Sequence, residues 1–425
     1  MIKEMDKKAA LELWKRFCSL TGLWEGWQHA DTPVALYNDH QAVLLAHPSP
    51  PTEYVQREVD GEHVYVAEPK PEYLTANTAI ELGGCFVATM RYDGAQSEAA
   101  LALLAHEAFH VYQAEQGFPM ANIMLMGAYP IFDPLVNALG EVEAFMLSRA
   151  LTKDDIVAVK AALDARAARQ ALLTAELRAY ENNNELHEGL ATYIEIRAAG
   201  LAGEVGRRNL DYLAKCNCRG WGASRMRFYY SGMAYGLLAD SLAAGWQQVT
   251  DVEKAHPAEL LAAALGHQAN SERRQFTPLD FAEIYAQQVE GTIHRQQELE
   301  RQVRAALPGQ GLRVEVSLRG QVTSGGWNPF GVKVLPDQTR FHPTVLTYNY
   351  DSGAKLRVSS GALEVAICQQ IVFERDDLTV IVDGLVWRGS SARGRLEVRG
   401  TDCYLLVPKA IISLAAGVLQ VTEET

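Results

Sequence analysis

The sequence predicts an α+β protein in which a mainly helical body lies between a small N-terminal sheet and a C-terminal all-β domain. Three observations support this fold class. Short apolar segments of strand character occupy much of residues 1–95. From about residue 97 to about residue 299, Ala, Leu, Glu and Arg dominate in a helical pattern. From residue 312 onward, apolar and polar residues alternate with a period of two, and the helical signal nearly vanishes.

The N-terminal part, residues 1–95, is expected to start with a helix and to continue as a small sheet. Leu11, Trp14 and Phe17 are spaced as on one face of a helix over residues 6–20. Strand-like segments follow at 33–37, 42–46, 64–67 and 85–92. Residues 83–92 are either an edge strand, on which a substrate can pair through its backbone, or an interior strand without a ligand. This part is expected to carry the edge strand of the catalytic unit.

Residues 96–305 are expected to form the helical body, with breaks near 117–134, 181–184 and 219–222. Residues 312–425 are expected to form a compact antiparallel β domain, because strand candidates at 312–318, 378–382, 385–388, 395–399 and 404–407 are separated by short turns. Trp327, Trp387 and Tyr404 are candidates for a face that binds a protein or a carbohydrate, and core packing explains them equally well.

The composition restricts the partners and the compartment. At 425 residues, with 48% hydrophobic and 21% charged residues, the chain has the composition of a globular protein of two or three domains. A net charge of −13 argues against nucleic acid or an anionic membrane as the main partner. No apolar stretch reaches the ~18 residues of a membrane span. Six cysteines without a disulfide framework, and no visible export signal, predict a cytoplasmic protein.

The residues from 101 to 112 contain the motif HExxH at His106, Glu107 and His110. Because residues four apart lie on the same face of a helix, the two imidazoles can hold one metal ion. Glu107, one position further round, can then reach the water that the metal activates. Five letters can also occur by chance, but the flanking residues from 99 to 105 are uncharged, as a buried active-site helix requires.

A catalytic zinc site needs a third protein ligand and one open position. The metzincin pattern is excluded, because Gln113 and Gln116 stand where a further histidine would follow, and the next histidine is His187. A glutamate ligand is therefore favoured. Residues 184–195, which include Glu188-Gly189-Leu190-Ala191-Thr192-Tyr193, resemble the E-G-x-A-x-Y helix of gluzincin peptidases, a branch of the zincin metallopeptidases.

This resemblance implies a zincin-like catalytic domain in which Glu188 is the third zinc ligand. Gly189 would let its helix lie close to the HExxH helix, and Glu195, seven residues on, would return to the same face and bond a ligand histidine. The separation from His110, 188 − 110 = 78 positions, is larger than in thermolysin-like or aminopeptidase-like gluzincins. The remaining readings are a solvated surface helix, or a ligand among four other residues: Glu185, His187, Glu141 and Glu143.

Residues 227–246 are similar to the tyrosine-glycine helix and Gly-Trp pair that follow the ligand helix in several gluzincin-like families. A phenol there could donate a hydrogen bond to the oxyanion, and Tyr230 and Tyr229 are the candidates. Aromatic residues at helical spacing are also typical of a core. His267 and His294 are possible substitutes. Cys216 and Cys218, with one residue between them, are interpreted as structural rather than as a second metal site.

The predicted function is a zinc-dependent metallopeptidase that acts on a peptide or protein, with Glu107 as general base. Residues 83–92 lack the glycine-glutamate-asparagine signature of zinc aminopeptidases, which favours endopeptidase or other exopeptidase action. Two alternatives remain open. One is a zinc hydrolase of a non-peptide amide or ester, and the other is a catalytically inactive zinc protein that acts through its β domain.

Overall fold

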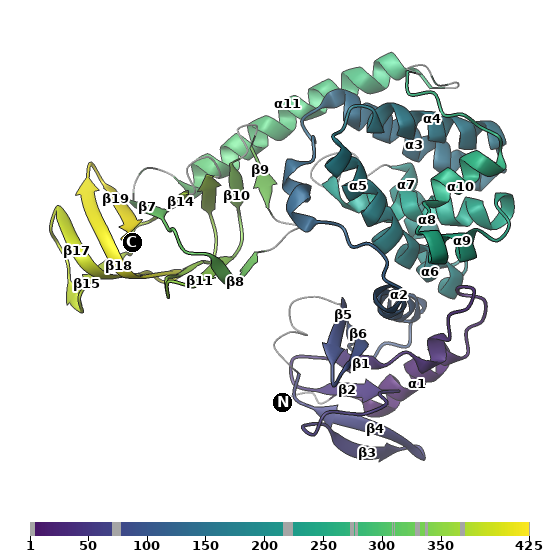
Figure 1. Cartoon of the computed structure of the whole chain (residues 1–425), viewed down its shortest axis with the longest axis horizontal. Helices are drawn as coiled ribbons and strands as arrows, with labels where there is room; N and C mark the ends of the chain where they lie inside the picture. Colours follow the sequence, from purple (N-terminus) through teal and green to yellow (C-terminus); the bar gives the residue numbers. More distant parts are fainter. Residues whose placement is uncertain are drawn as a thin grey trace. The chain divides into compact units, whose positions relative to one another are not determined.

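The structure is a computed structural model of the chain (Figure 1). It describes residues 5–69, 78–215, 224–272, 276, 279–307, 309, 311–327, 332–335, 339–365 and 370–424. The chain divides into two compact units, which are described separately. The first comprises Met1–Ala121, Leu135–Cys218 and Arg225–Ile284, and the second Asn122–Pro134, Arg219–Ser224 and Tyr285–Thr425. The combination of a helical body with sheets confirms the predicted α+β class.

The sheet of the first unit has six strands among the described residues, in the order β3-β4-β2-β1-β6-β5. Only β1 and β6 pair in parallel, and the other neighbours are antiparallel. Alternate residues face opposite sides, and the side that carries Val34, Leu36 and Val43 packs with α1 and α2 in the main core. The bounds are α1 (Lys7–Cys18), β1 (Val34–Tyr37), β2 (Ala42–Leu45), β3 (Val55–Val59), β4 (Glu62–Ala67), β5 (Thr78–Leu82), β6 (Cys85–Arg91) and α2 (Glu98–Glu115).

The segment 83–92 is not an edge strand, which corrects one of the two sequence readings. Its strand β6 pairs with β1 on one side and with β5 on the other. The physical reason is a two-residue hairpin turn at Gly83 and Gly84, whose φ angles of 59° and 85° favour glycine and fold Thr78–Leu82 back onto β6. The edge strand on this side is therefore β5, which lies next to α2 (Figure 1).

Helix α2 is buried along most of its length and packs against β5 and β6 of the sheet and against α1, α6 and α7. The run from α5 to α6 is nearly continuous, but a π-helical turn, η4, interrupts it, and both η4 and α6 pack against α8. These elements are α3 (Pro134–Lys153), α4 (Ile156–Gln170), α5 (Ala175–Asn184), η4 (Glu185–Gly189), α6 (Leu190–Ala199), α7 (Glu204–Ala214), α8 (Met226–Leu242), α9 (Trp246–Glu253) and α10 (Pro257–Ala264), with a short 3-10 helix η1 (His29–Asp31) before the sheet.

Gly189 lies close to a different helix from the one expected. A Cβ atom at Gly189 would lie 2.6 Å from Cα of Gly232, and a Cβ atom at Gly232 would lie 2.6 Å from the carbonyl oxygen of Glu185. The two glycines therefore allow the backbones of η4 and α8 to touch. The close approach is to α8, not to the HExxH helix.

The second unit contains the predicted C-terminal β domain, whose first strand begins at Leu312. Among the described residues its sheet has thirteen strands, and all pairs are antiparallel except β19 with β7. Trp387 packs against the apolar core of this sheet, whereas the Trp327 side chain lies outside the described residues. The strands are β7 (Leu312–Ser317), β8 (Val322–Trp327), β9 (Lys333–Val334), β10 (Arg340–His342), β11 (Leu346–Tyr350), β12 (Lys355–Val358), β13 (Ala362–Val365), β14 (Gln370–Arg375), β15 (Thr379–Val382), β16 (Leu385–Val386), β17 (Ser391–Arg399), β18 (Cys403–Ala415) and β19 (Val418–Glu423).

Two further helices belong wholly or largely to the second unit. These are η3 (Ile123–Ala128) and most of α11 (Phe281–Ala306). Cys18, Cys85 and Cys403 are free thiols. The pair Cys216 and Cys218, interpreted above as structural, lies outside the described residues, as does Cys368. Within the part of the chain that the structure describes, no helix is both long and apolar enough to cross a membrane.

Candidate metal centre

Helix α2 presents the HExxH motif inside the first unit. Its N-terminus is capped by Ser97, whose hydroxyl accepts a hydrogen bond from the backbone N–H of Ala100 at 3.0 Å. The chain leaves the helix at Gly117, which has the left-handed φ of 67° expected for a residue just past a helix. His106, Glu107 and His110 lie in between and are at most 6% exposed, as the uncharged flanks predicted.

His106, His110 and Glu188 converge into one cluster. Oε2 of Glu188 lies 3.7 Å from Nε2 of His106 and 3.6 Å from Nε2 of His110. The potential ligand atoms of the three residues all lie within 4.8 Å of one another. Two imidazole nitrogens and one carboxylate oxygen are a common ligand set of catalytic zinc sites, with metal–ligand distances of about 2.0–2.2 Å. The described residues therefore bring together a group that could hold a metal ion.

The π-helical turn η4 separates the directions of Glu185 and Glu188. Such a turn spans one residue more than an α-helical turn and often occurs at functional sites. The Glu185 carboxylate accepts a hydrogen bond from Ser231, and it lies 2.6 Å from Nη1 of Arg166 and 3.0 Å from Nε2 of His256. It thus faces away from the cluster, and only Glu188 joins the two histidines.

The other alternative ligands, Glu143, His187 and Glu141, do not belong to the cluster. Glu143 lies 2.6 Å from Nη2 of Arg169 and accepts a hydrogen bond from the Tyr235 hydroxyl at 2.8 Å. His187 stacks on His110 with ring centroids 4.3 Å apart, but neither it nor Glu141 is part of the cluster.

Glu195 contacts the ring nitrogen of His106 that does not face Glu188. Its Oε1 lies 2.8 Å from Nδ1 of His106, and its Oε2 accepts a hydrogen bond from the Asn209 side chain at 3.3 Å. A carboxylate that holds one ring nitrogen of a histidine fixes the ring orientation and leaves the other nitrogen for a metal. The sequence-predicted partner of a ligand histidine is therefore in contact with His106.

Gln113 orients His110 in the same way, a role that was not predicted from the sequence. Nδ1 of His110 lies 2.8 Å from the amide oxygen of Gln113. The Gln113 amide nitrogen donates to the backbone carbonyls of Leu186 and His187, at 2.9 and 3.0 Å. One buried amide thus orients a histidine of α2 and ties α2 to the turn that carries Glu188. The available signal was its position three residues after His110, on nearly the same helical face.

Glu107 has the features of a buried base beside this cluster. Burial raises the pKa of its carboxyl, although the charges of His106 and His110 act in the opposite direction. Its Oε2 is buried and has no hydrogen-bond partner among the described residues. A buried carboxylate oxygen without a partner is unusual. It fits a site in which a water molecule beside the metal ion donates a hydrogen bond to this oxygen.

Glu188 is held in its charged form. Burial alone would raise the pKa of this carboxyl, but the neighbouring imidazoles of His106, His110 and His187 hold the pKa well below its usual range. The same carboxylate accepts a hydrogen bond from Arg225, whose Nη2 lies 2.6 Å from Oε1. A charged carboxylate is the form that binds a metal.

The two candidate tyrosines lie in different places. The Tyr229 ring is nearly parallel to the His106 ring, with centroids 6.5 Å apart and planes at 20°. Burial, followed by the charge of Glu188, raises the pKa of Tyr229 well above its usual value, so the phenol is a hydrogen-bond donor at neutral pH. Tyr230 packs instead against Tyr212, with ring centroids 5.3 Å apart.

The two substitute histidines do not belong to the cluster. Nε2 of His267 lies 2.9 Å from the Asp164 carboxylate. His294 is part of α11, in the second unit. Of the residues proposed as oxyanion donors, only Tyr229 contacts the cluster residues.

A buried ionic network adjoins the site through Glu185. It consists of three carboxylates and three guanidinium groups, all with side chains at most 8% exposed. Arg169 contacts both Glu143 and Glu181, and Arg227 lies 3.4 Å from Glu181. The members come from α3, α4, α5, η4 and α8, and are Glu143, Glu181, Glu185, Arg166, Arg169 and Arg227.

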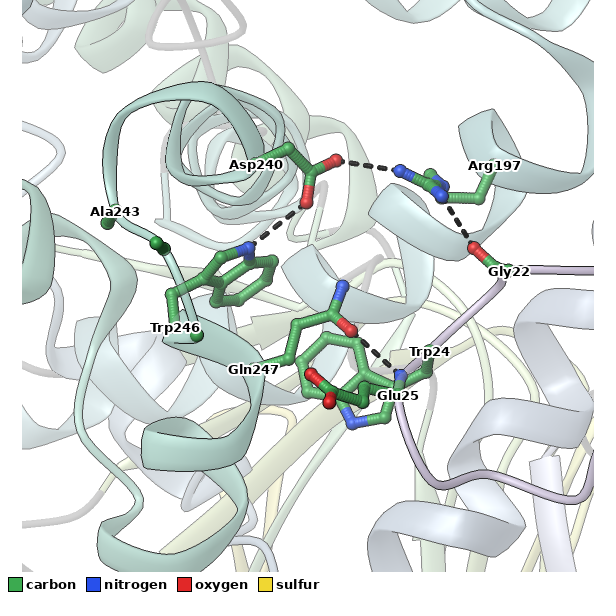
Figure 2. A pocket seen from close by; sticks show the side chains of 10 residues that line it. Gly22, Trp24, Glu25, Arg197, Asp240, Ala243, Trp246 and Gln247 are labelled. Atoms are coloured by element: carbon green, nitrogen blue, oxygen red, sulfur yellow. Dashed lines mark hydrogen bonds and ion pairs between the residues drawn. The ribbon is translucent and has the colours of Figure 1, made fainter.

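The Gly-Trp pair after α8 has a structural role. Gly245 adopts a left-handed φ of 72°, and Nε1 of Trp246 donates to the Asp240 carboxylate at 3.0 Å. Asp240 also binds Arg197, whose guanidinium reaches the carbonyl of Gly22 (Figure 2). These residues line a cavity of about 400 Å³ that does not include the metal-ligand candidates.

Comparison of the chain with protein-family models, with curated proteins and with solved structures found no match, so the likeness to gluzincin peptidases stands on the residues of this cluster alone.

Proposed function

We propose that this protein is a zinc-dependent metallopeptidase that hydrolyses peptide bonds in a peptide or protein substrate. The observation that carries the proposal is the convergence of His106, His110 and Glu188 beside the buried Glu107 carboxylate. This combination provides three protein ligands and a neighbouring base, which is the composition of a catalytic rather than a structural zinc site.

When bound, a zinc ion supplies positive charge that acidifies water and polarises a carbonyl group. Glu107 acts as general base: it takes a proton from the water as the new C–O bond forms at the carbonyl carbon. The same carboxyl then delivers the proton to the amine nitrogen as the C–N bond breaks. Burial raises the pKa of this carboxyl, which makes it a stronger base than an exposed glutamate.

Tyr229 stabilises the oxyanion in this scheme. The phenol remains protonated at neutral pH and stands beside His106, so it can donate a hydrogen bond to negative charge that develops near the cluster. The apolar residues of α2 and the buried neighbours of Glu107 exclude bulk water, which strengthens such a hydrogen bond.

The test combines metal analysis with substitutions of Glu188 and Glu107. Protein purified without chelator should contain one zinc ion per chain, and Glu188→Ala should lose it. Glu107→Gln should keep the zinc and lose about 10²- to 10⁴-fold in cleavage of quenched peptides, which is the usual contribution of a general base. Glu115→Gln, at the exposed end of the same helix, is the matched control and should retain activity.

Three results would contradict the proposal. Wild-type protein without stoichiometric metal would remove its basis. Full activity of Glu107→Gln would show that this carboxylate is not the base. Turnover of small amides or esters by a zinc-loaded protein that cleaves no peptide would assign a non-peptide hydrolase instead.

A further inference from the structure

We infer that Arg225 is a positioning residue that directs Oε2 of Glu188 toward the metal-ligand histidines; the inference rests on the proposed metal site. The two oxygens of this carboxylate have different partners. Oε1 accepts a hydrogen bond from Nη2 of Arg225 at 2.6 Å, whereas Oε2 faces Nε2 of His106 and of His110 at 3.7 and 3.6 Å.

This division matters for the chemistry of the site. A carboxylate that binds a metal through both oxygens fills a coordination position, whereas a catalytic zinc site must keep one position open for water. The hydrogen bond from Arg225 to Oε1 competes with coordination through both oxygens, so Oε2, which faces both imidazoles, is the oxygen directed at the ion. The partner of a metal-ligating carboxylate also fixes its direction, which improves metal affinity.

The contact is short and largely buried, so it is energetically significant. The Arg225 and Glu188 side chains are 16% and 11% exposed. A hydrogen bond between two charged groups at this distance is roughly twice as strong as one between neutral groups. Removing Arg225 would leave the Oε1 side of a buried carboxylate without its strongest partner.

The start of α8 holds the guanidinium in place. Arg225 is the residue just before α8, and its carbonyl oxygen accepts a hydrogen bond from the backbone N–H of Phe228 at 3.0 Å. Tyr229 follows one turn later, and Cζ of Arg225 lies 5.9 Å from the centre of its ring. One helical turn therefore directs Arg225 to the carboxylate and Tyr229 to His106.

A purely structural ion pair makes a different prediction. If Arg225 only neutralised a buried charge, its removal would destabilise the metal-free fold, and the affinity of the folded protein for zinc would stay the same or rise because a nearby positive charge is lost. A positioning role lowers the affinity for zinc itself. The two roles are separated by measuring metal affinity and metal-free stability on the same variants.

The experiment measures the zinc dissociation constant by competition with a chromophoric chelator. Arg225→Gln should bind zinc about 10- to 100-fold more weakly, the usual effect of losing a ligand's hydrogen-bond partner, and Arg225→Lys should fall in between. Arg197→Gln is the control. Arg197 also forms an arginine–carboxylate ion pair, with Nη1 2.9 Å from Asp240, but neither residue belongs to the cluster, so its zinc affinity should equal that of wild type. Urea unfolding in excess chelator reports the stability of each metal-free fold.

A second variant keeps the inference testable if Arg225→Gln folds poorly. In Arg225→Ala, millimolar guanidinium ion should recover part of the lost zinc affinity, and it should have no effect on wild type. Equal affinities in wild type and folded Arg225→Gln, or no recovery in folded Arg225→Ala, would overturn the positioning role. Absence of zinc binding by wild type would instead overturn the proposed metal site.

Discussion

The amide oxygen of Gln113 lies 2.8 Å from Nδ1 of His110, within the same helix. The tautomer of His110 follows from this contact, because an amide oxygen only accepts hydrogen bonds. Nδ1 therefore carries a proton, and Nε2, which lies 3.6 Å from Oε2 of Glu188, is the ring nitrogen left to bind a metal. A residue that is not a ligand thus prepares a ligand histidine for metal binding.

Gln113→Ala should weaken zinc binding about 10- to 100-fold, because the change removes the acceptor that orients His110. It also removes the side-chain donor to the carbonyls of Leu186 and His187, so a loss of metal-free stability of about 1–3 kcal/mol is expected as well. Zinc competition and urea unfolding in chelator measure the two effects. An affinity equal to that of wild type would show that the ring needs no such partner.

Tyr229→Phe should lower kcat by about 100-fold while zinc content and KM stay near those of wild type, because one oxyanion donor is removed. Tyr230→Phe, one residue further along α8, should change kcat little, since its ring packs on Tyr212. Steady-state kinetics on a quenched peptide compare the two. A larger loss in Tyr230→Phe than in Tyr229→Phe would contradict the assignment.

The stability of the first unit should fall in acid because of the network around Glu185. Burial raises the pKa of Glu185, but Arg166 and His256 outweigh it, so the folded pKa lies below the ordinary 4.5. A carboxyl with a depressed folded pKa stabilises the fold above its unfolded pKa, and this contribution is lost as the pH falls below about 4.5. His256 adds to the loss from about pH 6.5 downward, because burial lowers its pKa and the folded state favours the neutral ring.

Urea midpoints measured between pH 7 and pH 3 test this expectation. In Glu185→Gln the midpoint should be lower at pH 7, because breaking a buried ion pair costs about 3–5 kcal/mol. Below about pH 4.5 it should also change less with pH than the wild-type midpoint does. Parallel pH profiles for the two proteins would show that Glu185 does not control the acid sensitivity.

Gly232→Ala should destabilise the first unit by about 1–3 kcal/mol. The new methyl group meets backbone atoms of Glu185 and Gly189, which cannot rotate away as a side chain can. Gly291→Ala in α11 is the matched control. Its new methyl group would meet only the flexible Arg295 side chain, so better helix propensity should stabilise by about 0.5–1 kcal/mol. Thermal unfolding compares both with wild type, and an unaffected Gly232→Ala would mean that η4 and α8 can move apart.

Local patterns predicted much of the scaffold of the site. The apolar run around His106 and His110 predicted a buried helix, and the change of period at residue 312 marked the first strand of the β domain. Both features are periodicities within one segment, which a sequence displays directly. The choice of Glu188 came from a resemblance rather than from a period.

The missed features depend on contacts between distant segments. Nothing near Gln113 in the chain indicates that its amide meets carbonyls more than 70 positions later. Arg225 follows a predicted break, where no periodicity identifies a partner. The edge strand was misplaced for the same reason, since the order of strands is set by pairing across the sheet and not by the character of one strand.

The extra residue in η4 has a consequence for how this site can change. A helix advances by about 100° per residue, so inserting or deleting one position rotates everything on one flank relative to the other by that amount. The π turn is the local signature of such a one-residue excess. Loss of a single codon around Asn184 would return the helix to regular phase, and Glu185 could then no longer face Arg166 while Glu188 faces the histidines. The ionic network and the metal-ligand cluster therefore both depend on the number of residues in this helix staying the same.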